Sequence, residues 1–265
     1  MTNRPQRLNV FGIVKAVLLV VGAGAIFVAG FYVAERTSFR ADAPAPIQRE
    51  VLIDEAKAFV ARMGAPLYSS HEEELFVRDF FSDKQQGVFV DIGASHYKDR
   101  SNTFYLENKL GWSGLAIDPL PEFAADYRRY RPRTKYITMF VSDKPDERAT
   151  LYVGKTSLFS SSTKGHTDDF TDVGTTIDAP TTTLDALLAA AGVKAVDFLS
   201  IDVELHEPQV LAGFTIDNVK PKLVAVEALP PVRQQVLDYF AAHGYVVVAK
   251  YLRADPLNLW FMPAR

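Results

Sequence analysis

The segment VFVDIGASHYKDRSNTF, residues 88–104, decides the fold of this chain. Its apolar start predicts a buried strand over Val88–Asp91, and the residues that follow the turn predict a helix over Ser101–Leu110. A dinucleotide-binding turn between such elements carries G-x-G-x-x-G, because a pyrophosphate needs close approach of the backbone. This turn has a single glycine, Gly93. The segment is therefore either a cofactor turn for a ligand without a pyrophosphate or an ordinary strand-to-helix connection.

The rest of the sequence alternates strands with helices. Further strands are predicted at Gly114–Asp118, Lys135–Val141, Val196–Asp202, Leu223–Glu227, Tyr245–Ala249 and Asn258–Met262. Further helices are predicted at 51–63, 71–82, Glu122–Tyr130, Thr183–Ala191, Glu207–Phe214 and Pro231–Ala242. Strands separated by helices predict an α/β fold, with a parallel sheet covered on both faces. Residues 154–180 are polar and lack periodicity, so they are predicted to form a long loop.

The composition narrows the class of protein. Of the 265 residues, 48% are hydrophobic and 23% are charged, which excludes a disordered chain. The formal net charge of -3 argues against nucleic acid as a partner. The chain has no cysteine, so disulfides, thiol catalysis and thiolate metal sites are excluded.

An uncharged apolar stretch near the N-terminus, Ala16–Ala34, predicts a membrane anchor. As a helix it would be about 30 Å long, close to the hydrocarbon thickness of a bilayer. The alternatives are a cleaved signal peptide, whose apolar core is usually shorter, and a buried helix of the soluble part. The predicted organisation is a cytoplasmic stub and transmembrane helix over 1–34, a polar linker over 35–50 and a single domain over 51–265.

Acidic residues follow most of the predicted strands. They are Asp91, Asp118, Asp143, Asp202 and Glu227. One such acid alone is commonly a cap or turn residue, but in a parallel sheet the carboxyl ends of the strands meet at one edge, where ligands bind. A carboxylate after the second strand can accept hydrogen bonds from ribose hydroxyls. Both a nicotinamide cofactor and S-adenosylmethionine would fit such a site, and the single glycine favours S-adenosylmethionine, which has no phosphate.

Several longer motifs resemble one family. The segments FVDIGASHYKDRSNTFYLENKLGWSGLAIDPLP, VSD, TTTLDALL and VDFLSIDVELHEPQVLAGF are similar, in this order, to the FkbM-type S-adenosylmethionine-dependent methyltransferases. The resemblance spans about residues 70–262. It implies a class I methyltransferase fold, Rossmann-like, with a seven-stranded sheet whose last strand is antiparallel. Two departures are Leu205, where the family commonly has glycine, and the insert His96–Arg100, which would cover the cofactor, shape the acceptor pocket or only lengthen the turn.

The resemblance also implies roles for individual residues. The cofactor-binding residues would be Asp91, Gly93, Ser101, Asn102, Asp118 and Asp143. Ser101 and Asn102 stand where a helix begins, so each is a cap residue, a cofactor ligand or both. The proton acceptor would be Asp202, Glu204 or His206, provided that the chain stays extended far enough to place them on one side. Asp202, Glu204, His206 and Glu227 also have the oxygen and nitrogen atoms that could hold a divalent ion, but no metal is expected.

The expected function is that of a membrane-anchored S-adenosylmethionine-dependent methyltransferase (EC 2.1.1.-). It would methylate a hydroxyl group of a sugar, glycan or related metabolite. The alternatives are a non-catalytic binding or scaffold protein with the same fold, and a Rossmann-type oxidoreductase, which the single glycine of the turn disfavours.

The two indications of membrane topology disagree. Arg4, Arg7 and Lys15 before the apolar stretch outnumber Arg36 and Arg40 after it, and this favours a cytoplasmic N-terminus with an exported domain. S-adenosylmethionine, however, is made in the cytosol. We expect a single-pass membrane protein whose catalytic domain faces the cytosol.

Overall fold

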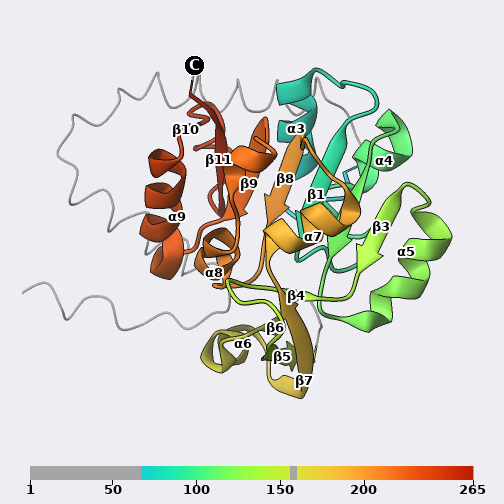
Figure 1. The fold of residues 1–265 in the computed structure, drawn as a ribbon, viewed down its shortest axis with the longest axis vertical. Coiled ribbons are helices and arrows are strands. Elements are labelled where there is room, and N and C mark those ends of the chain that lie inside the picture. Colours follow the sequence, from blue (N-terminus) through green and yellow to red (C-terminus); the bar gives the residue numbers. More distant parts are fainter. Residues whose placement is uncertain (1–66, 156–159, 265) are drawn as a thin grey trace, which may run out of the picture. The chain divides into compact units, whose positions relative to one another are not determined.

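The computed structural model describes residues 67–155 and 160–264 (Figure 1). They belong to one compact unit. The predicted transmembrane helix, the linker and the predicted helix at 51–63 lie outside the described residues. Among the helices that are described, none is both long and apolar enough to cross a bilayer.

A seven-stranded sheet forms the centre of the domain, in the order β10-β11-β9-β8-β1-β2-β3. Its strands are β1 (Val88–Ile92), β2 (Ser113–Ile117), β3 (Thr134–Ile137), β8 (Phe198–Ile201), β9 (Leu223–Glu227), β10 (Tyr245–Val247) and β11 (Asn258–Pro263). The five strands from β9 to β3 run parallel, whereas β11 is antiparallel to both of its neighbours. The predicted α/β fold with an antiparallel last strand is therefore confirmed.

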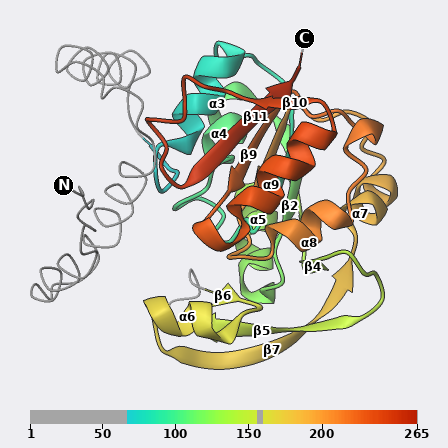
Figure 2. The ribbon, with the colours of Figure 1, turned by 90° about the vertical axis from the view of Figure 1, so that its left-hand side faces the viewer.

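Helices cover both faces of this sheet (Figure 1, Figure 2). They are α3 (Glu73–Phe81), α4 (Phe104–Leu110), α5 (Ala124–Tyr130), α7 (Leu184–Ala191), α8 (Glu207–Ala212) and α9 (Pro230–Ala242), with short 3-10 turns η2 (Pro121–Phe123) and η3 (Ile216–Asn218). Leu187, Val210 and Phe240 bring α7, α8 and α9 into one apolar core. Phe76 and Leu106 bring α3 and α4 into a second core on the other face. Because both faces of the sheet are buried, the sequences of the central strands are continuous apolar runs.

A second sheet of four strands lies beside the first, and it corrects the prediction of a long loop over 154–180. Its order is β4-β7-β5-β6, with β4 (Phe140–Val141), β5 (Arg148–Gly154), β6 (Ser160–Ser161) and β7 (Val173–Thr182). The helix α6 (Lys164–Phe170) packs on it (Figure 2). Only a small apolar group supports this sheet, including Leu151 and Ala179 against Phe140 and Leu120. The other positions of β7 are mostly polar and exposed, so the sequence lacks the apolar pattern of a strand.

Candidate active site

A cavity of about 670 Å³ opens where the parallel strands of the main sheet end. Small-molecule sites commonly have volumes of about 300–1,000 Å³. The loops after β1, β2, β8 and β9 line it, together with the chain before α3 and the start of β11. This is the edge at which the sequence predicted a ligand, because parallel strands point their carboxyl ends the same way.

Six of the nine predicted site residues line the cavity, namely Asp91, Gly93, Asn102, Asp118, Asp202 and Glu204. Glu227, considered as a metal ligand, lines it as well. Ser101, Asp143 and His206 are not part of the lining.

Gly93 makes the tight turn after β1. Its φ angle of +81° lies in the left-handed region, and a Cβ atom on Gly93 would lie 1.7 Å from the backbone oxygen of Asp202. The N–H groups of Gly93 and Ala94 donate to the carbonyl of Ile117 at 2.9 and 3.2 Å. The turn therefore passes directly against the end of β8 and is tied to the end of β2, and only glycine fits at this position.

Asp118, the acid after β2, is buried and holds the backbone of two loops. Its Oδ2 accepts a hydrogen bond from the N–H of Ser95 at 3.0 Å, and its Oδ1 accepts one from the N–H of Leu120 at 2.9 Å. Burial raises the pKa of Asp118 to about 6. A carboxylate oxygen has two lone pairs, so each oxygen can accept one further hydrogen bond from a ligand.

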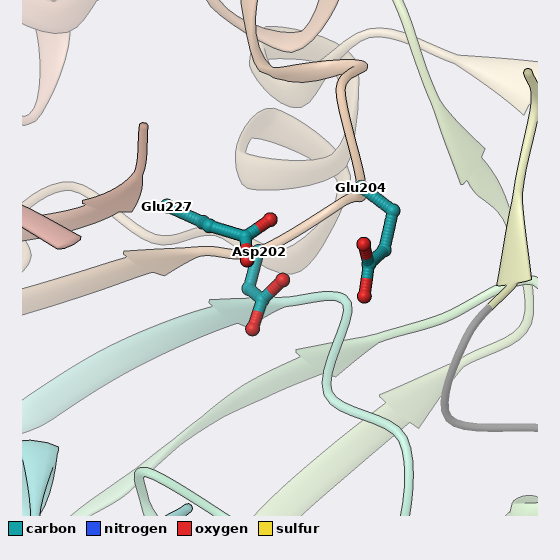
Figure 3. A group of neighbouring side chains, drawn as sticks. All are labelled: Asp202, Glu204 and Glu227. Carbon is teal, nitrogen blue, oxygen red and sulfur yellow. The ribbon is translucent and has the colours of Figure 1, made fainter. Parts of the chain in front are cut away.

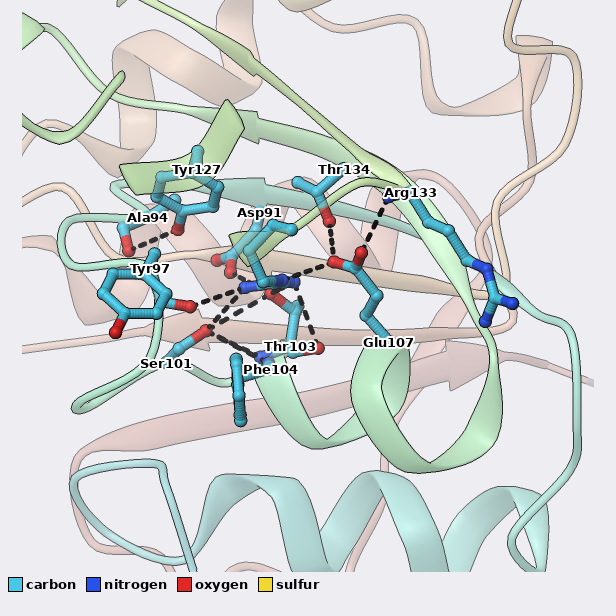
Figure 4. A network of polar contacts seen from close by, with 11 residues as sticks. Asp91, Ala94, Tyr97, Ser101, Thr103, Phe104, Glu107, Tyr127, Arg133 and Thr134 are labelled. Atoms are coloured by element: carbon cyan, nitrogen blue, oxygen red, sulfur yellow. Dashed lines mark hydrogen bonds and ion pairs between the residues drawn. The ribbon is translucent and has the colours of Figure 1, made fainter. Parts of the chain in front are cut away.

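Asp91 is tied to a buried arginine through Thr103 (Figure 4). Thr103 Oγ1 donates to Asp91 Oδ2 at 2.8 Å, and Arg131 donates to both Thr103 Oγ1 and the Thr103 carbonyl at 3.2 Å. Arg131 also forms an ion pair with Glu107 of α4, and both side chains are almost fully buried. Burial raises the pKa of Asp91 to about 6, against the lowering effect of the Thr103 hydrogen bond. One arginine thus fixes the acid at the end of β1 and the start of α4.

The insert His96–Arg100 packs mainly against α5. Arg131 donates to the carbonyl of Tyr97 at 2.9 Å, and the Tyr97 ring stacks on Tyr130 with 4.8 Å between centroids. His96 Nδ1 accepts the N–H of Asp99 at 3.0 Å, which closes the turn locally. Within the insert, Arg100 is the residue that lines the cavity. The insert therefore borders the cavity through Arg100 while the rest of it lengthens the turn.

Ser101 and Asn102 could each be a cap residue or a cofactor ligand, and the structure places them differently. The Ser101 hydroxyl is buried and accepts the N–H of Phe104 at 3.1 Å, so it stabilises the start of α4. Asn102 lines the cavity and donates from Nδ2 to the Ser200 hydroxyl at 3.1 Å.

His206 and Asp143 lie at the junction with the small sheet. Both ring nitrogens of His206 contact serine hydroxyls, Nε2 with Ser142 at 3.1 Å and Nδ1 with Ser162 at 3.2 Å. Burial lowers the pKa of His206 to about 4, so the ring is neutral at pH 7. Asp143 is exposed and accepts a hydrogen bond from Ser142 at 3.1 Å. These contacts indicate a structural role for His206.

Three carboxyl groups converge on the cavity (Figure 3). Asp202, Glu204 and Glu227 each offer an oxygen atom, and these atoms lie within 4.8 Å of one another. Asp202 is exposed at the cavity, and the protein atoms around its carboxyl group, together with the charges of Glu73 and Asp91, raise its pKa to about 7. Burial and the charge of Asp202 raise the pKa of Glu204 to about 8 and raise that of Glu227 well above its ordinary value.

Glu204 is held in an unusual backbone conformation. The φ angles of Glu204 and Leu205 are +54° and +75°, both in the left-handed region that non-glycine residues avoid. Ser161 donates to the Glu204 carbonyl at 2.7 Å, and His166 Nε2 lies 2.6 Å from Glu204 Oε2. The small sheet and α6 thus fix the position of Glu204. A left-handed turn of this kind is adopted most readily by glycine, which agrees with the glycine that the family resemblance implies at Leu205.

Some lining residues were missed from the sequence. Glu73 at the start of α3 is buried, and it accepts the N–H of His71 at 2.7 Å and the side-chain amide of Asn258 at 3.4 Å. A separate contact between the Glu73 carboxylate and the His71 ring raises the pKa of His71. The position of Glu73 at the start of a helix that packs on the sheet could have indicated its role. No local feature of the sequence indicated that Asn258 would line the cavity.

The sequence profile of one family, described as the methyltransferase FkbM domain, matches residues 91–247. No curated protein matches the chain at a significant level. Similar solved structures include an S-adenosylmethionine-dependent O-methyltransferase from Thermotoga maritima, which is 13% identical with a TM-score of 0.41 over 81% of this chain and 71% of that one. A 1,6-didemethyltoxoflavin-N1-methyltransferase from Burkholderia thailandensis, solved with its substrate and S-adenosylhomocysteine, is 13% identical with a TM-score of 0.36 over 84% and 91% of the two chains.

Proposed function

Because the chain belongs to the FkbM methyltransferase domain family, it is an S-adenosylmethionine-dependent methyltransferase, and we propose that it methylates a hydroxyl oxygen of a sugar, glycan or related metabolite. The observation that carries this proposal is the convergence of Asp202, Glu204 and Glu227 on the cavity. A hydroxyl group is a weak nucleophile and usually needs a base to take its proton during methyl transfer.

The cavity residues fit S-adenosylmethionine. Asp118 would accept hydrogen bonds from the ribose hydroxyls with its remaining lone pairs. The turn at Gly93 would lie against the methionine part, because a residue without a side chain allows close approach of the ligand to the backbone. Asp91 and Asn102 line the same part of the cavity. No pyrophosphate has to be held, so one glycine is enough.

Glu204 is the proton acceptor in this proposal. When bound, S-adenosylmethionine supplies an electrophilic methyl group. Glu204 lines the cavity, and its carboxyl group is oriented by His166. A base with a pKa near 8 is well matched to reaction close to neutral pH. Glu204 would take the hydroxyl proton as the acceptor oxygen bonds to the methyl group, while the surrounding carboxyls hold the oxygen in place.

The test combines product analysis with one variant. The purified protein is incubated with S-adenosylmethionine labelled in its methyl group and with a panel of sugars and glycans, and the methylated atom is identified by mass spectrometry and NMR. Glu204→Gln should lower the rate roughly 100-fold or more while its affinity for S-adenosylhomocysteine stays unchanged. The control is Glu147→Gln, an exposed residue of the same type. Transfer to nitrogen or carbon only, or full activity of Glu204→Gln, would overturn the proposal.

We also propose that the stretch Ala16–Ala34 anchors the protein in a membrane, with the catalytic domain in the cytosol. The support is its lack of charge over a bilayer-spanning length and the cytosolic origin of the cofactor. In intact cells, a reporter fused after Arg265 should react with an external reagent only after the membrane has been permeabilised. An externally accessible reporter would reverse the orientation.

A further inference from the structure

We propose that Asp202, Glu204 and Glu227 form a binding site for a hard divalent cation such as Mg²⁺, Mn²⁺ or Ca²⁺. Binding of the cation does not depend on the proposed function. The role of the cation, which is to hold the acceptor oxygen, rests on the proposed function. Figure 3 shows the three side chains reaching toward one region from two chain segments, the end of β9 and the turn after β8.

The spacing of the three ligand atoms suits one ion. They lie within 4.8 Å of one another, which is about twice a Ca²⁺–oxygen distance of 2.3–2.6 Å. A single ion can therefore touch all three oxygens, and a small inward movement of the side chains suits the shorter Mg²⁺–oxygen distance. Hard divalent cations prefer carboxylate oxygens and complete their shell with water or substrate oxygens.

The protein balances the charge of the group only in part, through His166 beside Glu204 and the more remote charge of His71 on Asp202. In the described part of the chain, no lysine, arginine or histidine forms an ion pair with Asp202 or Glu227, and His166 pairs only with Glu204 of the three. Carboxylates packed this closely repel one another unless they are neutralised. A divalent cation supplies that neutralisation at the point where the three groups meet.

The carboxyl group of Glu227 provides a separate indication. The Glu227 carboxyl group is hydrogen-bonded to that of Asp202, but its Oε2 atom is buried without a partner, and a buried polar atom without a partner costs free energy. Glu227 lines the cavity, and its carboxyl group lies next to that of Asp202 (Figure 3). A bound cation would satisfy this oxygen directly.

A bound cation would make Glu204 a ligand with a lowered pKa, and the ion would then assist the loss of the hydroxyl proton in place of Glu204. A carboxylate has two oxygens, so Glu204 can bind the ion through one oxygen while Oε2 keeps its contact with His166. Three protein oxygens leave coordination positions open on an ion that prefers six or more ligands. An acceptor hydroxyl at one of these positions would lose its proton more easily, because the ion stabilises the negative oxygen.

The experiment titrates the full chain with Mn²⁺ alone, and electron paramagnetic resonance counts the bound ions. The wild-type protein should bind one Mn²⁺, and Mg²⁺ should compete with it. Asp202→Asn and Glu227→Gln preserve the shape of the side chains, and each should weaken Mn²⁺ binding at least roughly tenfold. Asp238→Asn, which removes one exposed carboxylate on α9, is the matched control and should bind Mn²⁺ as the wild type does.

Circular dichroism and S-adenosylhomocysteine binding on the same samples verify that each variant is folded. No Mn²⁺ binding to the wild type, or equal binding by all the variants, would overturn the cation site and leave the proposed function intact. Mn²⁺ binding together with no methylation of any hydroxyl group would support the site and count against the proposed function.

Discussion

At the scale of single residues, Asp118 and Glu204 both follow a strand but have different surroundings. Asp118 is buried and binds backbone N–H groups of two loops, which places its remaining lone pairs toward the cavity. Glu204 lies in a strained turn and is fixed by His166. The first arrangement suits recognition of a cofactor, and the second suits exchange of a proton.

The pKa of Asp118 predicts how cofactor affinity depends on pH. In the proposed role the charged carboxylate would accept two ribose hydrogen bonds, and its pKa of about 6 means that it becomes protonated as the pH falls through 6. Affinity for S-adenosylhomocysteine should therefore be constant above about pH 7 and decrease by up to about tenfold per pH unit well below pH 6. Calorimetric titrations between pH 5 and 8 measure this. Asp118→Asn should bind more weakly at pH 7.5 and lose most of the pH dependence; an unchanged affinity in this variant would rule out the ribose role.

Leu205→Gly should stabilise the protein. The left-handed φ angle of Leu205 costs about 1–2 kcal/mol, whereas glycine adopts it freely but loses about 0.5–1 kcal/mol of chain entropy on folding. The expected net gain is roughly 0.5–1 kcal/mol in the free energy of unfolding. Urea denaturation measures it, with Leu205→Ala as the control that keeps the Cβ atom. Equal stability of the two variants would show that strain at this residue is negligible.

At the scale of elements, two segments outside the main sheet position the site. The C-terminal end of α5 brings its capping residue Arg131 against α4 and the insert His96–Arg100. The small sheet and α6 bring Ser161 and His166 against the turn after β8. The strands provide the acids, and these neighbouring elements fix where the acids point.

Arg131→Met should destabilise the protein strongly. It leaves the buried carboxylate of Glu107 without its ion-pair partner, and such losses cost about 3–5 kcal/mol. Arg129→Met, which changes an exposed residue of the same helix, is the control and should have little effect. Chemical denaturation of both variants measures the difference. A loss below about 1 kcal/mol for Arg131→Met would contradict the central role of this arginine.

His166→Gln should lower kcat and leave the KM for S-adenosylmethionine unchanged. His166 contacts Glu204 and does not line the cavity, so we expect its loss to disturb the orientation of the proposed proton acceptor and not the binding of the cofactor. We expect a loss of roughly tenfold or more in kcat, typical of a misplaced catalytic group. The exposed His243→Gln is the matched control. A rise in KM with kcat unchanged would instead place His166 in ligand binding.

At the scale of the whole molecule, the cavity unites segments from Ser69 to Asn258. Ligand binding should therefore protect distant parts of the sequence at the same time, because a ligand stabilises the folded form of everything that it contacts. Hydrogen exchange with and without S-adenosylhomocysteine should show slower exchange near residues 91–95, 117–120 and 202–204 together. Protection of only one of these segments would contradict a shared site.

The sequence predicted the main sheet well because each central strand is a short apolar run between polar turns. It also predicted that the acids at the strand ends lie together, because parallel strands have their carboxyl ends at the same edge of the sheet. The small sheet was missed because β7 is largely polar and is paired with β5, a partner distant in sequence. Glu73 and Asn258 were missed because only tertiary packing brings α3 and β11 to the cavity. His206 was expected beside Asp202, but the strand ends at Ile201 and the left-handed turn redirects the chain.

The small sheet leaves and rejoins the main fold at neighbouring points, and this has a consequence for the cavity. β4 pairs in parallel with the end of β7, with Phe140 opposite Thr181 and Val141 opposite Thr182. A segment whose two attachment points are adjacent behaves as a cassette, because it can be lengthened, shortened or exchanged without displacing the scaffold. The cassette contributes Leu151 and Ser160 to the cavity and holds Glu204 in place. Changes in the length or sequence of the cassette would therefore alter this wall of the cavity while the strands of the main sheet keep their places.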